Sequence, residues 1–169
     1  TSTGTSAAEA LRDAGVWGVV GAACSGASMA ANAVLAPAGI PMISYASTNP
    51  GLSDADAYPM FYRNVPSDAI QGPAGADMMT DAGVAEGALA VFGMTNDYGA
   101  GLADSVVAAW GSDKLCDVGR YDYPDTQTDF NDIATQMAAS TECTAVYLSS
   151  YIKDAQAIIE ALDDAGWDG

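Results

Sequence analysis

The fold is decided by residues 16–44, which read VWGVVGAACSGASMAANAVLAPAGIPMIS. The β-branched residues at the start predict a strand from Val16 to Val20, and a second short apolar run predicts another from Pro41 to Ser44. The Ala-rich segment between them has helical length and predicts a helix over Ser28–Ala36. A strand, a helix and a further strand in this order are typical of a parallel sheet with crossover helices.

The same alternation continues to the end of the chain and predicts an α/β fold. Further strands are expected over residues 60–64, 88–92, 115–121 and 145–149, and further helices over residues 7–13, 69–82, 101–109, 130–139 and 154–165. Strictly alternating elements place the loops that follow the strands at one edge of each sheet. In open α/β sheets, ligands bind at this carboxyl edge.

The connector RNVPSDAIQG, residues 63–72, divides the chain. Its Asn, Pro and Ser residues are typical of a turn, and Ser67 or Asp68 suits the cap of the helix that follows. We therefore predict that residues 1–65 are part of one lobe and that residues 66–169 are most of another. A sheet of two or three strands before the break is small for a complete lobe.

The charge of the chain restricts its partners. It has 22 Asp and Glu against 5 Lys and Arg, a formal net charge of −17. Such a surface repels phosphate groups and anionic lipid headgroups, so nucleic acid is not an expected partner. The acid is mostly Asp, which suits a protein that lives in high salt, although an ordinary acidic surface explains the composition almost as well.

The absence of histidine restricts the chemistry. The strand–turn–helix around CSGAS has the shape of a nucleophile turn, with Cys24 or Ser25 as the nucleophile of an α/β hydrolase. That reaction needs an imidazole base, which this sequence lacks, and the commonest neutral metal ligand is missing with it. We therefore expect no catalytic residue, no metal site and no cofactor, and we keep the hydrolase as a minor alternative.

The three cysteines are not spaced as a zinc or CxxC redox motif. Cys116 and Cys143 each stand near the start of an expected strand. They fit a disulfide between neighbouring strands in an oxidising compartment, and they fit two buried free thiols equally well.

No charged residue occurs between Ala14 and Ser53, an interval longer than the roughly 20 residues that span a bilayer. Ser, Asn, Thr and Pro residues interrupt the interval, and its apolar residues are mostly Ala and Gly, so we do not expect a membrane span. No signal peptide is visible at the start. The first residues already read as a helix and suggest the middle of a larger protein.

Two uncharged turns within this interval are candidates for a binding site. The first, Ser25–Ser28, places hydroxyls and free N–H groups at a helix N-terminus and suits a carboxylate, although Ser28 is also explained simply as the helix cap. The second, Ser44–Pro50, follows the adjoining strand at the same edge. Together they can bind a zwitterion. Tyr98 and Tyr151 follow two strands of the second lobe and can contact an apolar ligand group.

Six segments occur in an order that resembles the branched-chain amino acid binding proteins of ABC transporters, which are type I periplasmic binding proteins. They are CSGAS, IPMISYASTNPGLSD, FYRNVPSDAIQGPAGADMM, NDYGAGLADS, the Thr128-Asp129-Phe130 segment and YLSSY. The resemblance covers essentially all 169 residues. It implies two Rossmann-like lobes with parallel sheets flanked by helices, joined by a hinge near Val65, with the ligand clamped between them.

The resemblance also implies roles for individual residues. Ser25 and Thr48 are similar to the hydroxyls that meet the ligand carboxylate and ammonium, and Ala46 to the residue whose carbonyl accepts from the ammonium. The tyrosines are similar to those that the second lobe brings down on closure. The ligand-binding residues expected on this basis are Ala23, Cys24, Ser25, Ala46, Ser47, Thr48, Tyr98 and Tyr151.

The function implied is a periplasmic or extracellular solute-binding protein, free or anchored to the membrane, and not an enzyme. It binds a small molecule, a branched-chain or other amino acid, and delivers it to an ABC permease. The family's first strand would precede Thr1 and its ammonium-fixing acidic residue would follow Gly169, so we expect a fragment of a longer chain. An extracellular sensing domain of a receptor on the same fold is the alternative, and the charge disfavours a DNA-binding repressor.

Overall fold

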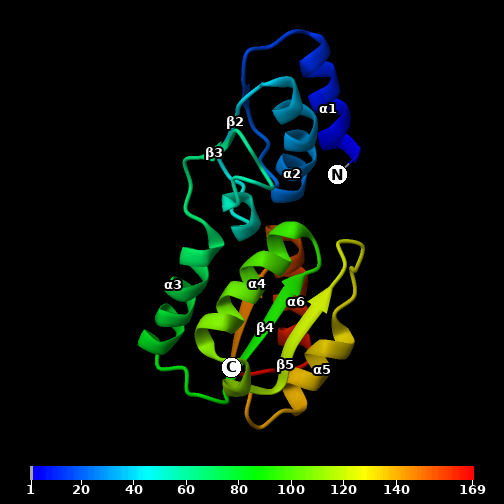
Figure 1. Ribbon diagram of the computed structural model, residues 1–169. Helices are drawn as coiled ribbons and strands as arrows, with labels where there is room; N and C mark the ends of the chain where they lie inside the picture. Colours follow the sequence, from blue (N-terminus) through cyan, green and yellow to red (C-terminus); the bar gives the residue numbers. More distant parts are fainter. Residues whose placement is uncertain (1) are drawn as a thin grey trace. The chain divides into compact units, whose positions relative to one another are not determined.

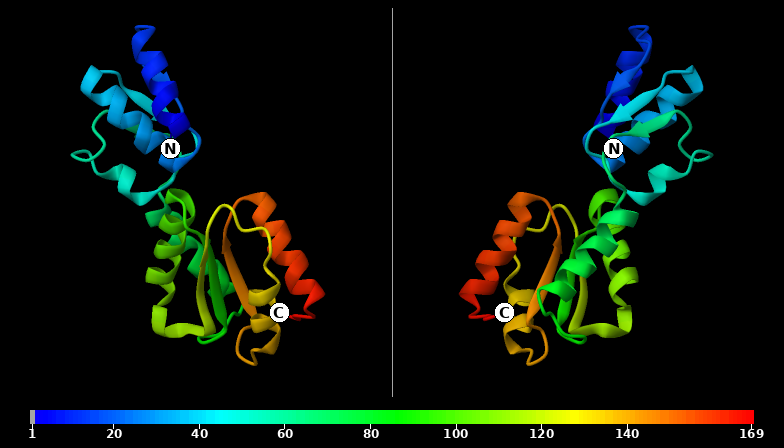
Figure 2. Two further views of the ribbon diagram at one scale, coloured as in Figure 1. Left: turned by 90° about the vertical axis from the view of Figure 1, so that its right-hand side faces the viewer. Right: turned by 90° about the vertical axis from the view of Figure 1, so that its left-hand side faces the viewer.

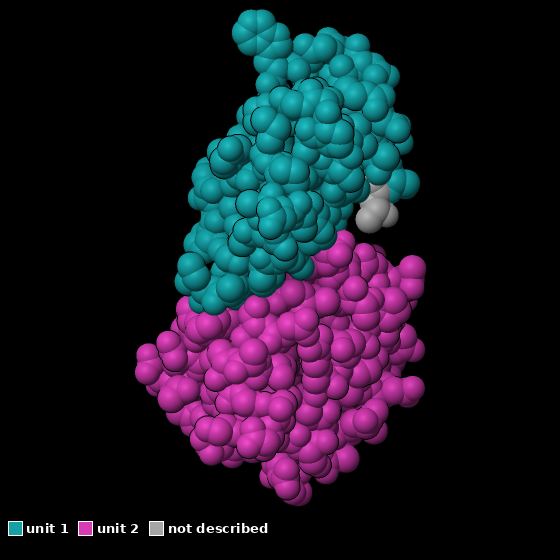
Figure 3. Space-filling view, in the orientation of Figure 1, with its two compact units in different colours: residues 1–70 teal, residues 71–169 magenta. Residues whose placement is uncertain are grey.

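A computed structural model describes residues 2–169. The chain divides into two compact units, the first ending at Ile70 and the second running from Gln71 to Gly169; Figure 3 colours them separately. The boundary predicted after residue 65 thus falls inside unit 1. Helix α3 (Asp68–Asp81) begins before the division and continues past it.

Unit 1 is a small parallel sheet with its helices on one face. Strands β1, β2 and β3 lie in that order, and all described pairs are parallel. Helices α1 and α2 pack against each other (Figure 1). The elements are α1 (Ser2–Asp13), β1 (Val19–Val20), α2 (Ser25–Leu35), the short 3-10 helix η1 (Ala36–Ala38), β2 (Met42–Ser44), η2 (Pro50–Ser53) and β3 (Phe61–Arg63).

The register of this sheet separates its two faces into rows. One row, Val19, Met42 and Phe61, packs against the buried side chains of α1 and α2. The opposite row is Val20, Ile43 and Tyr62, with 79%, 42% and 61% of their surfaces exposed. Parallel sheets normally have both faces covered. Here the described residues cover one.

Unit 2 is a three-layer α/β unit. Its strands lie in the order β5-β4-β6 and are parallel. Figure 2 shows α4 on one side of this sheet and α6 on the other. The remaining elements are β4 (Leu89–Met94), α4 (Asp97–Trp110), η3 (Ser112–Lys114), β5 (Leu115–Tyr123), α5 (Asn131–Ala139), β6 (Ala145–Ser149) and α6 (Ile152–Asp164).

Every residue of the central strand β4 is buried. Successive side chains alternate between the faces, so Leu89 and Val91 pack under α3 and α4, while Phe92 and Met94 pack under α5 and α6. This continuous apolar run is the pattern of a strand covered on both sides. The predicted α/β class with parallel, helix-flanked sheets is confirmed.

Cys116 and Cys143 form a disulfide, with their Cα atoms 5.2 Å apart. The disulfide, one of the two alternatives for these cysteines, is therefore present. The expectation that it joins neighbouring strands was wrong, because β4 lies between β5 and β6. Both cysteines belong to the core cluster under α5 and α6. The bridge thus crosses that face and links β5 to the segment that leads into β6.

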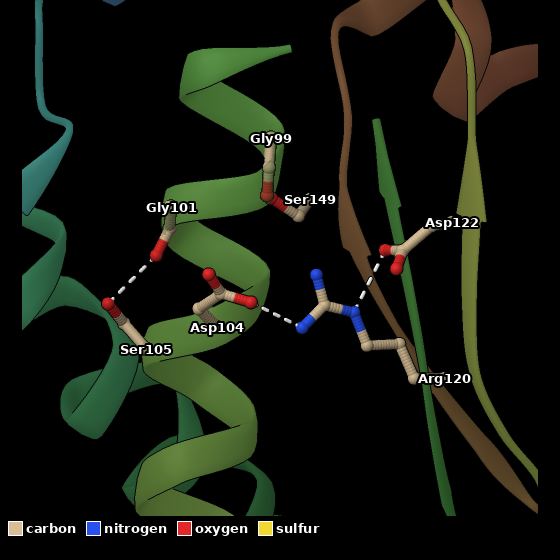
Figure 4. Close-up of polar contacts among 7 residues, drawn as sticks. All are labelled: Gly99, Gly101, Asp104, Ser105, Arg120, Asp122 and Ser149. Atoms are coloured by element: carbon tan, nitrogen blue, oxygen red, sulfur yellow. Dashed lines mark hydrogen bonds and ion pairs between the residues drawn. The ribbon is translucent and has the colours of Figure 1, made fainter. Parts of the chain in front are cut away.

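Arg120 links β5 to α4. Its Nε donates to Asp122 at 2.8 Å and its Nη1 pairs with Asp104 (Figure 4). The Asp104 side chain is 67% exposed and that of Asp122 is 43% exposed, so these ion pairs contribute modestly to stability.

Several expected boundaries differ from those in the structure, and two of the differences have local reasons. Strand β1 begins at Val19 rather than Val16. Its pairing with β2 begins opposite Met42, because the preceding residue, Pro41, has no N–H to donate to a hydrogen bond between strands. Helix α4 begins at Asp97 rather than Gly101, because the Asn96 side chain caps it by accepting from the Gly99 N–H at 2.8 Å. No helix between Ser2 and Gly169 is long and apolar enough to cross a membrane.

Candidate functional site

The two uncharged turns of unit 1 lie together because β1 and β2 are adjacent and parallel. The first turn follows β1 and, with the residues that connect β1 to α2 included, comprises residues 21–28; the second, residues 44–50, follows β2. Their strands therefore end at the same edge of the sheet. Hydrogen bonds between the turns fix how they face each other.

Buried serine hydroxyls join the turns. Ser44 Oγ donates to the Ala22 carbonyl at 2.5 Å and accepts from the Ser47 N–H at 2.9 Å. Ser47 Oγ lies 2.9 Å from Ser28 Oγ and 3.1 Å from the carbonyl oxygens of Ala22 and Ala23. All three hydroxyls are on fully buried residues. They satisfy backbone groups that the turns would otherwise bury unpaired, and so hold the turns in one arrangement.

This network assigns Ser28 a different role from the expected helix cap. Helix α2 begins at Ser25 with Cys24 in the cap position, and the Cys24 side chain makes no cap hydrogen bond. Ser28 therefore lies inside the first helical turn, where its hydroxyl accepts from the Ala22 N–H at 3.2 Å. The capping interpretation is wrong, because the serine hydroxyl binds the preceding turn instead of the helix end.

The first turn has exposed residues directly before the start of α2. Ala23 and Cys24 are exposed, whereas Ser25 is buried and its Oγ accepts from the Asn49 N–H at 3.2 Å. Because Ser25 already accepts from the backbone of the second turn, it also helps to join the turns. A helix N-terminus offers N–H groups and the positive end of the helix dipole to an anion such as a carboxylate.

Arg63 supports the second turn from β3. Its Nη1 donates to the Asn49 carbonyl at 2.9 Å and lies 3.4 Å from the Ser47 carbonyl, while its Nη2 bonds Ser53 Oγ. The guanidinium thus binds two carbonyl groups of the second turn. It holds the path of the chain from Ser47 into η2.

Thr48 is half-buried and is bonded to the start of α3. Its Oγ1 donates to Asp68 Oδ2 at 2.9 Å, and the Asp68 N–H donates to the Thr48 carbonyl at 2.9 Å. Burial raises the pKa of Asp68, and the bond from Thr48 and the charge of Arg63 oppose that rise.

In unit 2, Tyr98 and Tyr151 stack on each other, with ring centroids 5.3 Å apart and an interplanar angle of 12°. Tyr98 lies in the first turn of α4 rather than in the expected loop, and Tyr151 is the N-cap residue of α6. Buried Ser149 fixes the two segments, because its Oγ donates to the Gly99 carbonyl at 2.7 Å (Figure 4). Gly99 also permits close packing, since a Cβ there would lie 2.5 Å from the Met94 carbonyl oxygen.

The eight expected ligand-binding residues therefore fall into two groups. Six lie in the joined turns of unit 1, and the tyrosine pair lies in unit 2. Within unit 1, Ala23, Cys24 and Ala46 are exposed and Thr48 is half-buried, whereas Ser25 and Ser47 are buried with hydroxyls engaged in the network. That these residues contact a ligand remains a prediction.

Sequence reasoning missed three residues that shape this site. Ser44 appeared as the end of a strand and the start of the second turn without a role of its own, Asp68 only as a possible cap, and Arg63 as part of a connector. A signal for Arg63 was present, because it is the first basic residue after a long uncharged interval. Nothing in the sequence showed that Asp68 would meet Thr48, because that contact depends on how α3 packs.

The site offers little support for the hydrolase alternative. Ser25 is 1% exposed and its oxygen accepts a backbone hydrogen bond. Both lysines, Lys114 and Lys153, belong to unit 2. Cys116, Asp117 and Cys143 form a cluster of metal-ligand type, but the disulfide removes the thiolates that a metal would bind.

Two units with parallel sheets and polar turns at a sheet edge fit the type I periplasmic binding fold. Residues 1–169 match the family described as receptor family ligand binding region. The chain belongs to this family, and the predicted resemblance is confirmed. Both the family and the fold are those of ligand-binding proteins.

Solved structures and curated relatives agree with this assignment. An ABC transporter substrate-binding protein from Desulfitobacterium hafniense aligns with a TM-score of 0.71 at 25% identity, covering 96% of this chain and 48% of that one. A structure of such a protein from the same organism in complex with Leu aligns with a TM-score of 0.73 at 24% identity. The chain thus spans about half the length of these proteins.

The curated relatives are receptors that match a shorter segment. Metabotropic glutamate receptor 8 of Homo sapiens is 47% identical over 66 residues, 39% of this chain and 7% of the receptor. Metabotropic glutamate receptor 4 of Rattus norvegicus is 47% identical over 64 residues, 38% of this chain and 7% of the receptor. The match therefore covers a small part of each receptor.

Proposed function

We propose that this chain is part of an extracytoplasmic solute-binding protein that binds an amino acid or a related small compound and delivers it to an ABC permease. One observation carries the proposal: two uncharged turns are locked together by buried serines while Ala23, Cys24 and Ala46 remain exposed. Such a surface offers backbone dipoles to a zwitterion without a competing charge.

The proposed ligand contacts follow from the chemistry of each group. We propose that the N–H groups at the start of α2 receive the ligand carboxylate, and that the Ala46 carbonyl and the Thr48 hydroxyl receive its ammonium. The stacked pair of Tyr98 and Tyr151 is proposed to contact the ligand's apolar part. The solved relative in complex with Leu supports an aliphatic amino acid as the first ligand to test.

A location outside the cytoplasm is part of the proposal. The Cys116–Cys143 disulfide supports it, because disulfides persist in oxidising compartments such as the periplasm and the cell surface.

Calorimetric titration with leucine, valine, alanine, glutamate and small amides tests the ligand. We expect heat of binding from at least one amino acid, together with a raised melting temperature. Thr48→Val is expected to weaken that binding by about 1–3 kcal/mol, because a buried ligand N–H then lacks its acceptor. If none of these compounds gives heat or shifts the melting temperature, the proposed ligand class is wrong.

A ligand-sensing receptor domain is the second candidate function, and the 47% identity to metabotropic glutamate receptor 8 favours it. The discriminating observation is the natural polypeptide around this chain. A membrane span followed by a signalling domain favours the receptor. Stimulation of a permease's ATPase by the ligand-loaded protein favours the transporter.

A further inference from the structure

A carboxylate lies directly against the disulfide of unit 2. The Asp117 side chain belongs to an exposed residue, whereas Cys116 and Cys143 are only 5% and 4% exposed. One oxygen of the carboxylate, Oδ1, lies 3.3 Å from Cys143 Sγ. The buried sulfur pair therefore has an exposed negative charge in contact with it.

Local hydrogen bonds hold this carboxylate in place. Asp117 Oδ1 accepts from Ser140 Oγ at 2.5 Å and from the Val118 N–H at 3.1 Å. Ser140 Oγ in turn accepts from the Cys143 N–H at 3.0 Å. The serine thus ties the carboxylate to the backbone of the residue whose sulfur it contacts.

An irregularity in β5 explains how Asp117 reaches the bridge. The register of β5 against β4 shifts between residues 115 and 120, and Gly119 within this stretch has φ 66°, a left-handed conformation that favours glycine. Consecutive side chains of a regular strand point to opposite faces, whereas a bulge re-aims them. The shifted register thus allows Asp117 and its neighbour Cys116 to meet the same partner, Cys143.

Reduction of a disulfide by small thiols begins with attack by a thiolate. Its sulfur forms a bond to one sulfur of the bridge, the S–S bond breaks, and the other cysteine leaves as a thiolate. A second thiolate displaces the protein sulfur and releases the small molecule as its own disulfide, so two thiols supply the two electrons. Negative charge is present at the reacting sulfurs throughout, and a carboxylate 3.3 Å away raises the free energy of that charge.

We propose that Asp117 protects the Cys116–Cys143 bridge from reduction by small thiols, and most strongly from anionic ones. Its charge repels the attacking thiolate and disfavours the thiolate that leaves. Burial of the sulfurs restricts access for every thiol, as does Trp167, whose Nε1 donates to the Cys143 carbonyl at 3.0 Å. The carboxylate adds a discrimination by charge that burial does not supply. This role is independent of any ligand and preserves the bridge where thiols are present.

The test measures second-order rate constants for reduction of the folded protein by two thiols. The thiolate form of glutathione carries a net negative charge, whereas the ammonium group of cysteamine balances the charge of its thiolate. A Cys24→Ala background removes the free thiol, and the mass of the alkylated protein reports reduction. We expect Asp117→Asn to accelerate reduction by glutathione about 10-fold and reduction by cysteamine clearly less. The amide keeps an acceptor oxygen for Ser140, so the fold is retained.

Two controls separate charge from loosening of the structure. Glu142→Gln removes an equal charge beside Cys143, but Glu142 bonds Ser140 through its backbone N–H, so this variant should change either rate by less than about 2-fold. Ser140→Ala keeps the charge and removes the hydroxyl, so the ratio of the two rate constants should stay at the wild-type value.

Three results would overturn the role of Asp117. The first is an unchanged rate in Asp117→Asn, and the second is equal acceleration with both thiols, which indicates loosening. The third is a wild-type rate that does not depend on thiol concentration, because reduction then follows unfolding instead of attack on the native bridge. None of these results bears on the proposed binding of a ligand by unit 1.

Discussion

Strand β4 of unit 2 buries apolar side chains on both faces, whereas the strands of unit 1 bury one row and expose the other. The loops of unit 2 therefore extend from a sheet that has an apolar core on both faces and is cross-linked by a disulfide. The turns of unit 1 rest on a thinner core and are fixed by serine hydroxyls. Where apolar burial is limited, hydrogen bonds between buried polar groups determine the local geometry.

The largest effect is expected from the core of unit 2. Phe92→Ala removes a fully buried ring beneath α5 and α6 and should lower the free energy of unfolding by about 3–5 kcal/mol. Unfolding in guanidinium chloride measures this loss of unfolding free energy. Tyr62→Ala is the matched control, because Tyr62 lies on the exposed face of unit 1; a comparable loss there would show that this face is covered in solution.

The second-largest effect on stability is expected from loss of the disulfide. It closes a loop between cysteines 27 residues apart. Removing it with Cys116→Ala and Cys143→Ala should cost about 3.5 kcal/mol of stability, mainly through the greater entropy of the unfolded chain. Unfolding with and without a reductant checks the value. Cys24→Ala, which changes an exposed free thiol, should have no such effect and should leave the sensitivity to reductant in place.

Breaking the serine network should cost less in stability. Ser47→Ala removes the hydrogen bond to the Ala23 carbonyl and the bond with Ser28 Oγ, and it should destabilise unit 1 by about 1–3 kcal/mol. Amide hydrogen exchange in β2 should accelerate while that in β4 stays unchanged. Ser6→Ala on the exposed side of α1 is the control. Equal exchange in the two variants contradicts a structural role for the network.

The smallest effect is expected on the exposed row of unit 1. Ile43→Thr should change the stability by less than about 0.5 kcal/mol, because the side chain is 42% exposed and a β-branched residue is kept. Met42→Thr, one residue earlier and facing the helices, should destabilise clearly. Thermal unfolding of both variants tests the register directly. A large loss from Ile43→Thr would place this row against a partner.

Much of the fold could be predicted because the apolar pattern and the chain order agree. Strand β6 has the expected bounds, Ala145–Ser149, and every expected helix is present within a few residues. Strand order could not be predicted, because it depends on pairing between distant segments. This is why the cysteines were assigned to neighbouring strands although β4 lies between them.

The candidate site was predictable in its backbone and not in its side-chain contacts. The two turns follow from the positions of β1 and β2 in the sequence. The role of Ser28 depends on where α2 begins, and the contact between Thr48 and Asp68 depends on the packing of α3. Both are settled by tertiary structure, which local patterns do not contain.

Because two of the three cysteines form the disulfide, a single cysteine remains for reaction with thiol reagents. Among the described residues Cys24 is the one free thiol, and it is exposed at the start of α2, within the first turn. A maleimide dye would therefore attach at this position without any engineered cysteine. If the turn binds a ligand as proposed, the bound ligand should slow the reaction of Cys24 with the dye, and the rate of labelling would report occupancy of the turn.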